Sequence, residues 1–175
     1  MNNSKFKKYA ARHREDLTGE HKFGDAGQLV LFIAFMVVLI TDAFVFKYST
    51  LLNGYVPFLS VRLPLGIVTL LVSGYMAWTG MVLIFGTARD TQHVVRQGVF
   101  ARVRHPIYLS EILLYLGLLL LNISQAAAGV WITGIVFLHY ISRYEEKVLL
   151  ERFGAEYRRY IQDVPMYFPR LRRKK

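Results

Sequence analysis

Long apolar runs alternate with basic segments along this chain, and this alternation constrains the fold more than any other feature. The first run covers residues 27–46, and the second begins near Arg62 and Pro64 and reaches Phe85. Each is as long as the roughly 20 residues that a helix needs to cross a membrane. Pro64 suits the first turn of its helix, where the missing N–H costs nothing. The pattern is typical of a polytopic membrane protein.

Two shorter apolar runs follow at residues 107–121 and 126–141, and the polar turn Asn-Ile-Ser-Gln separates them. They predict an antiparallel helical hairpin. At about 1.5 Å per residue, each run is shorter than a hydrocarbon core of about 30 Å. We therefore expect the polar ends of both helices to lie near one membrane surface.

The helical pattern continues beyond Ile141 and is interrupted at Gly154. Its apolar face is formed by Val148, Leu149, Phe153, Tyr157 and Tyr160. Two prolines and a basic tail then end the chain. We predict an all-α membrane bundle of about four transmembrane helices, with a C-terminal hairpin and a cytoplasmic helical extension.

The charge of the chain predicts its topology. The sequence is 54% hydrophobic, yet its formal net charge is +10 at neutral pH. Basic residues gather before the first run, between the second and third, and after the fourth, whereas the opposite side has only Lys47 and Arg62. Because cytoplasmic segments of membrane proteins are enriched in Lys and Arg, we place both termini and the connection 86–106 in the cytoplasm. The protein would lie in the cell membrane of a prokaryote or the endoplasmic reticulum membrane of a eukaryote.

We interpret residues 1–175 as one membrane domain with three parts: an N-terminal cytoplasmic segment (1–26), two spanning helices (27–85) and a cofactor-binding catalytic region (86–175). The N-terminal segment lacks the apolar core of a cleavable signal peptide. The basic segments favour contact with anionic headgroups over nucleic acid, since they flank membrane spans. The absence of cysteine excludes disulfides and Cys-ligated zinc, and we predict no metal site.

Polar residues gather at one end of the predicted hairpin, where in a membrane protein they mark function by default. The residues that precede the third run are Arg102, Arg104 and His105. Those that share one face of its helix are Tyr108, Glu111 and Tyr115. Those at the end of the fourth run are His139, Arg143 and Glu146. Because the helices are antiparallel, we expect the two ends to converge.

Each of these residues also has a purely structural explanation. Arginines and Tyr108 can anchor in headgroups, His105 can cap a helix, and the pair Glu145 and Glu146 can be solvated helix charges. Asp42, alone in the first run, lies near enough to the outer end to reach water. Only the joint pattern favours a site. We find no glycine-rich dinucleotide loop and no Ser-His-Asp arrangement.

The segments "QGVFARVRHPIYLSEILLYLG" and "RYEEKVLLERFGAEYRRYIQDVPMYFP" resemble the isoprenylcysteine carboxyl methyltransferase and phospholipid methyltransferase superfamily of integral membrane enzymes. The shared pattern is Gly-Val-aromatic, Arg-His-Pro-x-Tyr, an apolar hairpin, Glu-Glu, Phe-Gly-x-Glu-Tyr and Val-Pro-x-x-x-Pro, in that order. It covers roughly residues 90–170. Two positions depart from the family: Ser110 followed by Glu111 replaces a common Gly, and Phe100 replaces a common Tyr.

The resemblance implies S-adenosylmethionine-dependent methyl transfer to a lipid-linked acceptor at the cytoplasmic membrane face, most like carboxyl methylation of an isoprenylcysteine. The residues it implies for the cofactor are Gln92, His93, Val94, Val95, Phe100, His105, Pro106, Ile107, Tyr108, Glu145 and Glu146. We add Arg104 on chemical grounds, as a cation for the carboxylate of the cofactor. The residues it implies for catalysis are Arg143, Glu146 and His139. Arg143 would steer an acceptor carboxylate, whereas an amine acceptor would require Glu111 or Glu146 as base.

Three alternatives stay open at this point: a phospholipid N-methyltransferase, an NADPH-dependent sterol reductase-like enzyme, and a non-enzymatic lipid-binding membrane protein. The Glu-Glu pair and the small number of helices argue against the reductase. The partners that we expect are the membrane and a lipid or prenylated small-molecule acceptor. Neither the acceptor atom nor the oligomeric state follows from the sequence.

Overall fold

The computed structural model describes residues 24–49, 59–85 and 93–168. Within these ranges the chain is helical and contains no strand. The α-helices are α2 (Gly24–Thr41), α4 (Leu59–Phe85), α5 (Pro106–Leu121), α6 (Gln125–Phe153) and α7 (Ala155–Asp163). Two short helices join them, the π-helix η1 (Asp42–Phe46) and the 3-10 helix η2 (Gly98–Ala101). The predicted all-α membrane bundle is confirmed.

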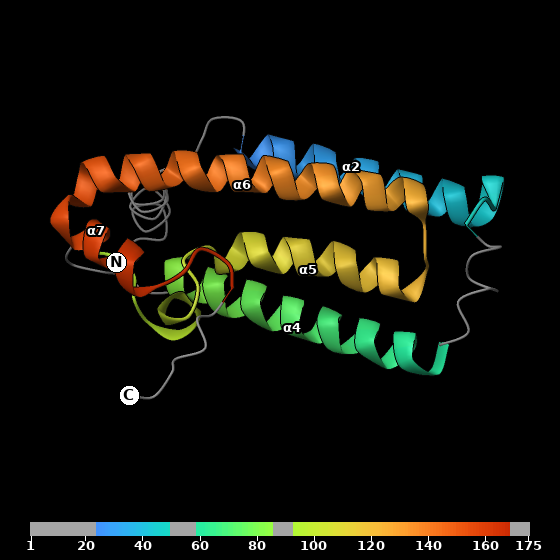
Figure 1. Ribbon diagram of the computed structural model, residues 1–175, viewed down its shortest axis with the longest axis horizontal. Coiled ribbons are helices and arrows are strands. Elements are labelled where there is room, and N and C mark those ends of the chain that lie inside the picture. The colour runs from blue at the N-terminus through green and yellow to red at the C-terminus, as the bar shows by residue number, and fades with distance from the viewer. Residues whose placement is uncertain (1–23, 50–58, 86–92, 169–175) are drawn as a thin grey trace, which may run out of the picture.

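The long helices run side by side in two pairs (Figure 1). Helix α2 lies along α6, and α4 lies along α5, while the turn between α5 and α6 links the pairs. Three segments of the described chain are long and apolar enough to cross a membrane: Gly24–Phe46, Ser60–Phe85 and Gln125–Phe153. Helix α5 is apolar but has only 16 residues, so it covers about 24 Å. This shortness agrees with the prediction for the third run.

Small residues bring α4 and α5 close together. A Cβ added to Gly117 would lie 2.7 Å from the Leu70 side chain, and one added to Gly66 would lie 3.2 Å from the Gly117 carbonyl oxygen. The buried Ser73 hydroxyl also donates a 2.7 Å hydrogen bond to the Ser110 carbonyl. Close backbone approach and interhelical hydrogen bonds are the usual means of helix association in lipid, where burial of apolar surface supplies little driving force.

Helix α4 begins earlier than the sequence indicated. It starts at Leu59, so Pro64 lies inside the helix and the prediction of a first-turn proline is wrong. The first turn of the helix contains the polar residues Ser60 and Arg62, so it lies before the apolar run. Hydropathy indicates the part of a helix that faces lipid, and a helix can begin several residues earlier. Pro64 removes a single N–H near this end, and the helix continues to Phe85.

A polar cluster made of Asp42, Ser49 and Ser124 closes the bundle end that is remote from α7. Asp42 is 5% exposed and accepts a 2.6 Å hydrogen bond from the Ser49 hydroxyl and a second from the Ser124 hydroxyl. Ser124 also caps α6 by accepting from the Ala127 N–H. The expectation that Asp42 reaches water is therefore wrong, because the nearby Ser49 and the distant Ser124 satisfy its carboxylate inside the protein.

Tyr115 fills the space between α2, α5 and α6. Its side chain is 1% exposed, its ring stacks on Phe35 with 4.5 Å between centroids, and Gly134 on α6 leaves room for its edge. Its hydroxyl donates a 2.6 Å hydrogen bond to Glu111 one turn earlier on α5. The partner that satisfies Glu111 thus comes from its own helix.

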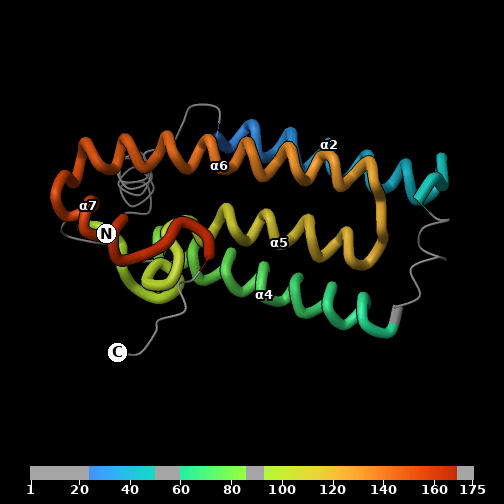
Figure 2. The backbone as a smooth tube through the Cα atoms, in the orientation of Figure 1, coloured from blue at the N-terminus to red at the C-terminus, as the bar shows by residue number. Residues whose placement is uncertain are grey.

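The C-terminal region folds back onto the loop before α5 (Figure 2). Helix α6 is continuous to Phe153, and Gly154, with a positive φ of 53°, allows the sharp turn into α7. The segment after α7 then pairs with the loop through two backbone hydrogen bonds, from the Arg104 N–H to Pro165 and from the His105 N–H to Met166. This return brings residues 164–168 beside the start of α5.

Candidate active site

The predicted convergence of the two hairpin ends is present in the structure. Arg104 Nε donates a 2.7 Å hydrogen bond to Glu146 Oε1, and His105 Nε2 lies 3.3 Å from the same oxygen. His105 Nδ1 lies 3.6 Å from Glu145 Oε2, and the Tyr108 hydroxyl donates to Glu145. Two adjacent glutamates of α6 therefore both face the start of α5, and both are less than 10% exposed.

Arg104 is held by protein groups. Besides its bond to Glu146, its Nη1 donates to the carbonyl oxygens of Ile161 and Val164. These bonds join the loop before α5 to α6 and to the end of α7. The charge of Glu146 is thereby neutralised inside the protein, whereas Glu145 interacts with Tyr108 and His105.

Burial controls the protonation of the groups around this pair. It lowers the pKa of His105, an effect that the hydrogen bond to Glu146 only partly opposes, so the imidazole is neutral at physiological pH. Burial raises the pKa of Tyr157 and of Tyr160 above the ordinary range. It raises the pKa of Tyr167 to about 12. These hydroxyls stay protonated, and the Tyr160 hydroxyl donates a 2.7 Å hydrogen bond to the Phe100 carbonyl oxygen.

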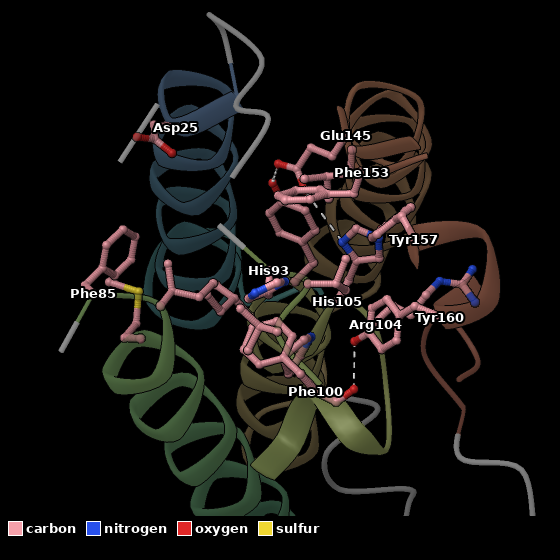
Figure 3. Close-up of a pocket in the computed structure, with 18 of the residues that line it drawn as sticks. Asp25, Phe85, His93, Phe100, Arg104, His105, Glu145, Phe153, Tyr157 and Tyr160 are labelled. Carbon is pink, nitrogen blue, oxygen red and sulfur yellow. Dashed lines mark hydrogen bonds and ion pairs between the residues drawn. The ribbon is translucent and has the colours of Figure 1, made fainter. Parts of the chain in front are cut away.

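A cavity of about 290 Å³ opens beside this cluster (Figure 3). Predicted site residues that line it are His93, Val94, Val95, Phe100, Arg104, His105, Pro106, Ile107, Tyr108 and Glu145. Glu146 stands behind them and holds Arg104 and His105. Gln92 lies outside the described residues. Residues from the loop, the start of α5 and α6 thus share one cavity, as the motif order implied.

Besides Glu146, three predicted residues do not line the cavity. Arg143 is 64% exposed, and its Nη1 lies 3.8 Å from Glu146 Oε2, on the far side of that carboxylate from Arg104. The His139 ring lies 6.2 Å from the ring of Tyr167. Glu111 faces Tyr115. The catalytic roles of Arg143, His139 and Glu146 stay predictions.

The sequence reasoning missed about half of the lining. From α2 come Asp25 and Gln28, and from the end of α4 come Met81, Ile84 and Phe85. From α6 and α7 come Leu149, Phe153, Tyr157 and Tyr160. The last four stand on the apolar face that the helical periodicity had identified, so their burial was foreseeable. No local pattern marked the α2 and α4 residues.

The lining suits a cofactor that combines an aromatic base with charged and hydroxyl groups. Phe100, Phe153, Tyr157 and Tyr160 offer flat apolar surfaces. The Glu145 carboxylate supplies an acceptor for ammonium or hydroxyl groups. S-adenosylmethionine has an adenine, a ribose, an ammonium and a positively charged sulfur, and these residue types fit it. Arg104 is a weaker partner for its carboxylate, because three of its N–H groups already bind protein oxygens.

The fold and this site define a class: integral membrane enzymes with a cavity of aromatic, apolar and charged residues at one end of a helical bundle. The profile of the phospholipid methyltransferase family matches residues 59–156, more than half of the chain. The chain belongs to this family, which confirms the resemblance seen in the sequence. No curated protein matches the chain significantly. Membership makes the protein a membrane methyltransferase that acts on lipid-like substrates, a reaction for which the family normally uses S-adenosylmethionine.

Proposed function

We propose that this protein binds S-adenosylmethionine in the cavity beside His105 and transfers its methyl group to a lipid-like acceptor. The observation that carries the proposal is the meeting of Glu145 and Glu146 with Arg104, His105 and Tyr108 at a cavity with aromatic walls. Residues that only anchor a protein in lipid headgroups are exposed at the membrane surface, whereas these charged residues are buried. Burial of ionised groups costs free energy, so a buried charged cluster favours a functional site.

Each part of the site has a proposed role. Glu145 binds the ammonium or the ribose hydroxyls, and the aromatic residues of the loop, α6 and α7 enclose the adenine. Glu146 is a positioning residue, because it acts through Arg104 and His105. The bound cofactor supplies an electrophilic methyl group on a positively charged sulfur. The protein's remaining work is to align the acceptor with that group and to exclude water.

The carboxyl group of an isoprenylcysteine is the acceptor that the sequence resemblance favours. A carboxylate requires a cation nearby, and Arg143 is the candidate. Its guanidinium lies outside the cavity lining but within 3.8 Å of Glu146. It would have to leave that glutamate and turn inward to meet an acceptor carboxylate. Methylation of a carboxylate in this cavity therefore requires the Arg143 side chain to move.

An amine acceptor, as in phospholipid N-methylation, is the second candidate. The specific observation in its favour is the charge of the lining, where Asp25 and Glu145 are acidic, His105 is neutral and Arg104 is bound to Glu146. An acidic cavity attracts a protonated amine and repels a carboxylate. We further propose that the site lies at the cytoplasmic membrane face, as the distribution of basic residues predicts.

Calorimetric titration with S-adenosylhomocysteine tests the cofactor assignment. We expect saturable binding by the wild type and a loss of at least about 100-fold in affinity for Glu145→Ala and His105→Ala, since each removes a buried polar partner. Glu151→Ala, an exposed glutamate on the same helix, serves as the control and keeps wild-type affinity. Unchanged binding by both site variants would refute the residue assignment.

Two further measurements separate this proposal from its alternatives. Titration with NADPH in the presence of S-adenosylhomocysteine distinguishes a reductase-like site, because a shared site gives competition. In cells, a Glu145→Ala, Glu146→Ala double variant that keeps the protein's biological role would support a non-enzymatic function. A methyltransferase loses that role.

A further inference from the structure

Helix α2 lies outside the region matched by the family, yet it contributes two polar side chains to the cavity. These are Asp25 in its first turn and Gln28 one turn later. Their spacing of three places them on one face of the helix. The rest of α2 is strongly apolar, so its polar side chains beside the cavity favour a role in binding a ligand there.

Helix α2 contacts α6 closely beside the cavity. A Cβ added to Gly27 would lie 2.3 Å from Cζ at the tip of the Phe137 ring, so the glycine allows this ring to pack directly against the α2 backbone. The neighbouring Gln28 lines the cavity. This part of α2 is therefore held against the helix that carries Glu145.

The cavity has two distinct ends. In Figure 3, Asp25 and Phe85 lie on one side of the view, and Arg104 and Tyr160 lie on the other. Of the aromatic residues proposed for the adenine, Tyr157 and Tyr160 lie on the second side of this view. Helix α4 also contributes the apolar side chains of Met81, Ile84 and Phe85 to the lining, and Phe85 lies on the same side of the view as Asp25. An acidic group next to an apolar wall suits the head and the first methylene groups of an amphiphile.

We infer that α2 forms the acceptor end of the cavity, where Gln28 and Asp25 are specificity-determining residues that bind an amine headgroup of the lipid acceptor. The inference rests on the proposed function and extends it to the acceptor. The Gln28 amide oxygen and the Asp25 carboxylate accept hydrogen bonds from the N–H groups of an ammonium. The Gln28 amide N–H groups can donate to a carboxylate head, so discrimination against a carboxylate comes from the negative charge of Asp25.

The absence of cysteine in the chain provides a direct test. In the Gln28→Cys variant, reconstituted in phosphatidylcholine vesicles, the introduced thiol is labelled with a maleimide. A long-chain alkylamine, the fatty acid of equal chain length, and S-adenosylhomocysteine are added separately as protecting probes. Gln125→Cys is the matched control, because Gln125 is exposed at the start of α6, away from the cavity.

We expect the alkylamine to slow labelling of the Gln28→Cys variant about tenfold, as an occupied binding site would, and to leave Gln125→Cys unchanged. The fatty acid and S-adenosylhomocysteine should change the rate less than about twofold. Adding Asp25→Asn to the Gln28→Cys variant should abolish protection by the amine. Equal protection by the fatty acid would overturn the headgroup selectivity, protection by S-adenosylhomocysteine would assign Gln28 to the cofactor end, and absence of protection would remove α2 from the site.

Methyl transfer gives a second readout. Gln28→Leu should lower kcat/KM for an amine acceptor about tenfold, the loss expected for one hydrogen bond to a charged group, while affinity for S-adenosylhomocysteine stays at the wild-type value. Gln125→Leu is the control for the same chemical change. Failure of the proposed function is distinguishable, because a wild type that does not bind S-adenosylhomocysteine refutes the cofactor assignment whether or not the amine protects the thiol.

Discussion

Arg104 joins three parts of the molecule through the geometry of its guanidinium group. Its Nε binds Glu146 on α6, and its Nη1 binds carbonyl oxygens of Ile161 and Val164 near the end of α7. A lysine in its place would keep the charge but would be unable to reproduce these divergent hydrogen bonds. The residue therefore acts as a structural clamp for the site.

Arg104→Lys should reduce the free energy of unfolding by about 3 kcal/mol, because it leaves a buried carboxylate and two carbonyls poorly satisfied. Thermal unfolding in detergent measures the change. The matched control is Arg96→Lys, since the pair Arg96–Asp163 is exposed and its loss should cost less than about 1 kcal/mol. Equal effects of the two substitutions would contradict the clamp role.

The pKa of His105 predicts how stability depends on pH. Burial lowers this pKa below the ordinary value of 6.5, so the unfolded chain takes up a proton at a higher pH than the folded protein does. Stability should therefore fall as the pH drops through 6.5. Unfolding temperatures recorded between about pH 8 and pH 5 measure this slope. The slope should be shallower for His105→Gln, and identical slopes would exclude His105 as its source.

At the scale of helices, an aromatic contact in the middle of the bundle and a polar cluster at its end both hold α2 in place. Tyr115 and Phe35 pack α5 against α2, whereas Asp42 and Ser124 tie η1 to the start of α6. The π-helix turns Asp42 inward, where Ser49 also reaches it. These hydrogen bonds therefore tie the end of the first spanning segment to the start of α6.

Asp42→Ala should lower the free energy of unfolding by about 1–3 kcal/mol, because the buried Ser49 and Ser124 hydroxyls lose their acceptor. The neighbouring Thr41→Val removes only a hydrogen bond to a carbonyl of its own helix and should have little effect. Thermal unfolding of both variants in the same detergent makes the comparison. An Asp42→Ala variant as stable as the wild type would show that this cluster does not stabilise the fold.

Periodicity and apolar length predicted most of the helices, including the break at Gly154 and the face that carries Tyr157 and Tyr160. The spacing of apolar residues is a local property of each helix, so one segment of sequence is enough to predict it. The π-helix at Asp42 and the position of Pro64 inside α4 were not predicted. The π-helix lies within the first apolar run, and helix α4 begins before its apolar part. Hydropathy indicates neither feature, because it does not report hydrogen bonding.

For the molecule as a whole, the structure places the candidate site at one end of the bundle and the Asp42 cluster at the other (Figure 1). The charge distribution predicts that the site end faces the cytoplasm. Because the chain lacks cysteine, single introduced thiols report this orientation without background labelling.

In intact cells, a membrane-impermeant maleimide should label Gln125→Cys, at the end opposite the site. It should label Glu151→Cys, on the extension of α6, only after the cells are permeabilised. Both positions are exposed in the structure, so the difference reports membrane sidedness and not burial. The reverse pattern would contradict the predicted topology.

The sequence by itself determined the helical membrane class, the hairpin and the ordered motif from His105 to Glu146. The membrane class and the hairpin follow from the length of the apolar runs and from helical periodicity. The motif residues lie at the two ends of one antiparallel hairpin, and these ends must meet. Only the tertiary structure decided that Arg104 binds the protein, that Arg143 lies outside the cavity and that α2 supplies Asp25 and Gln28. Contacts between segments far apart in the chain depend on how the helices pack, and no local pattern encodes the contact between Gly27 on α2 and Phe137 on α6.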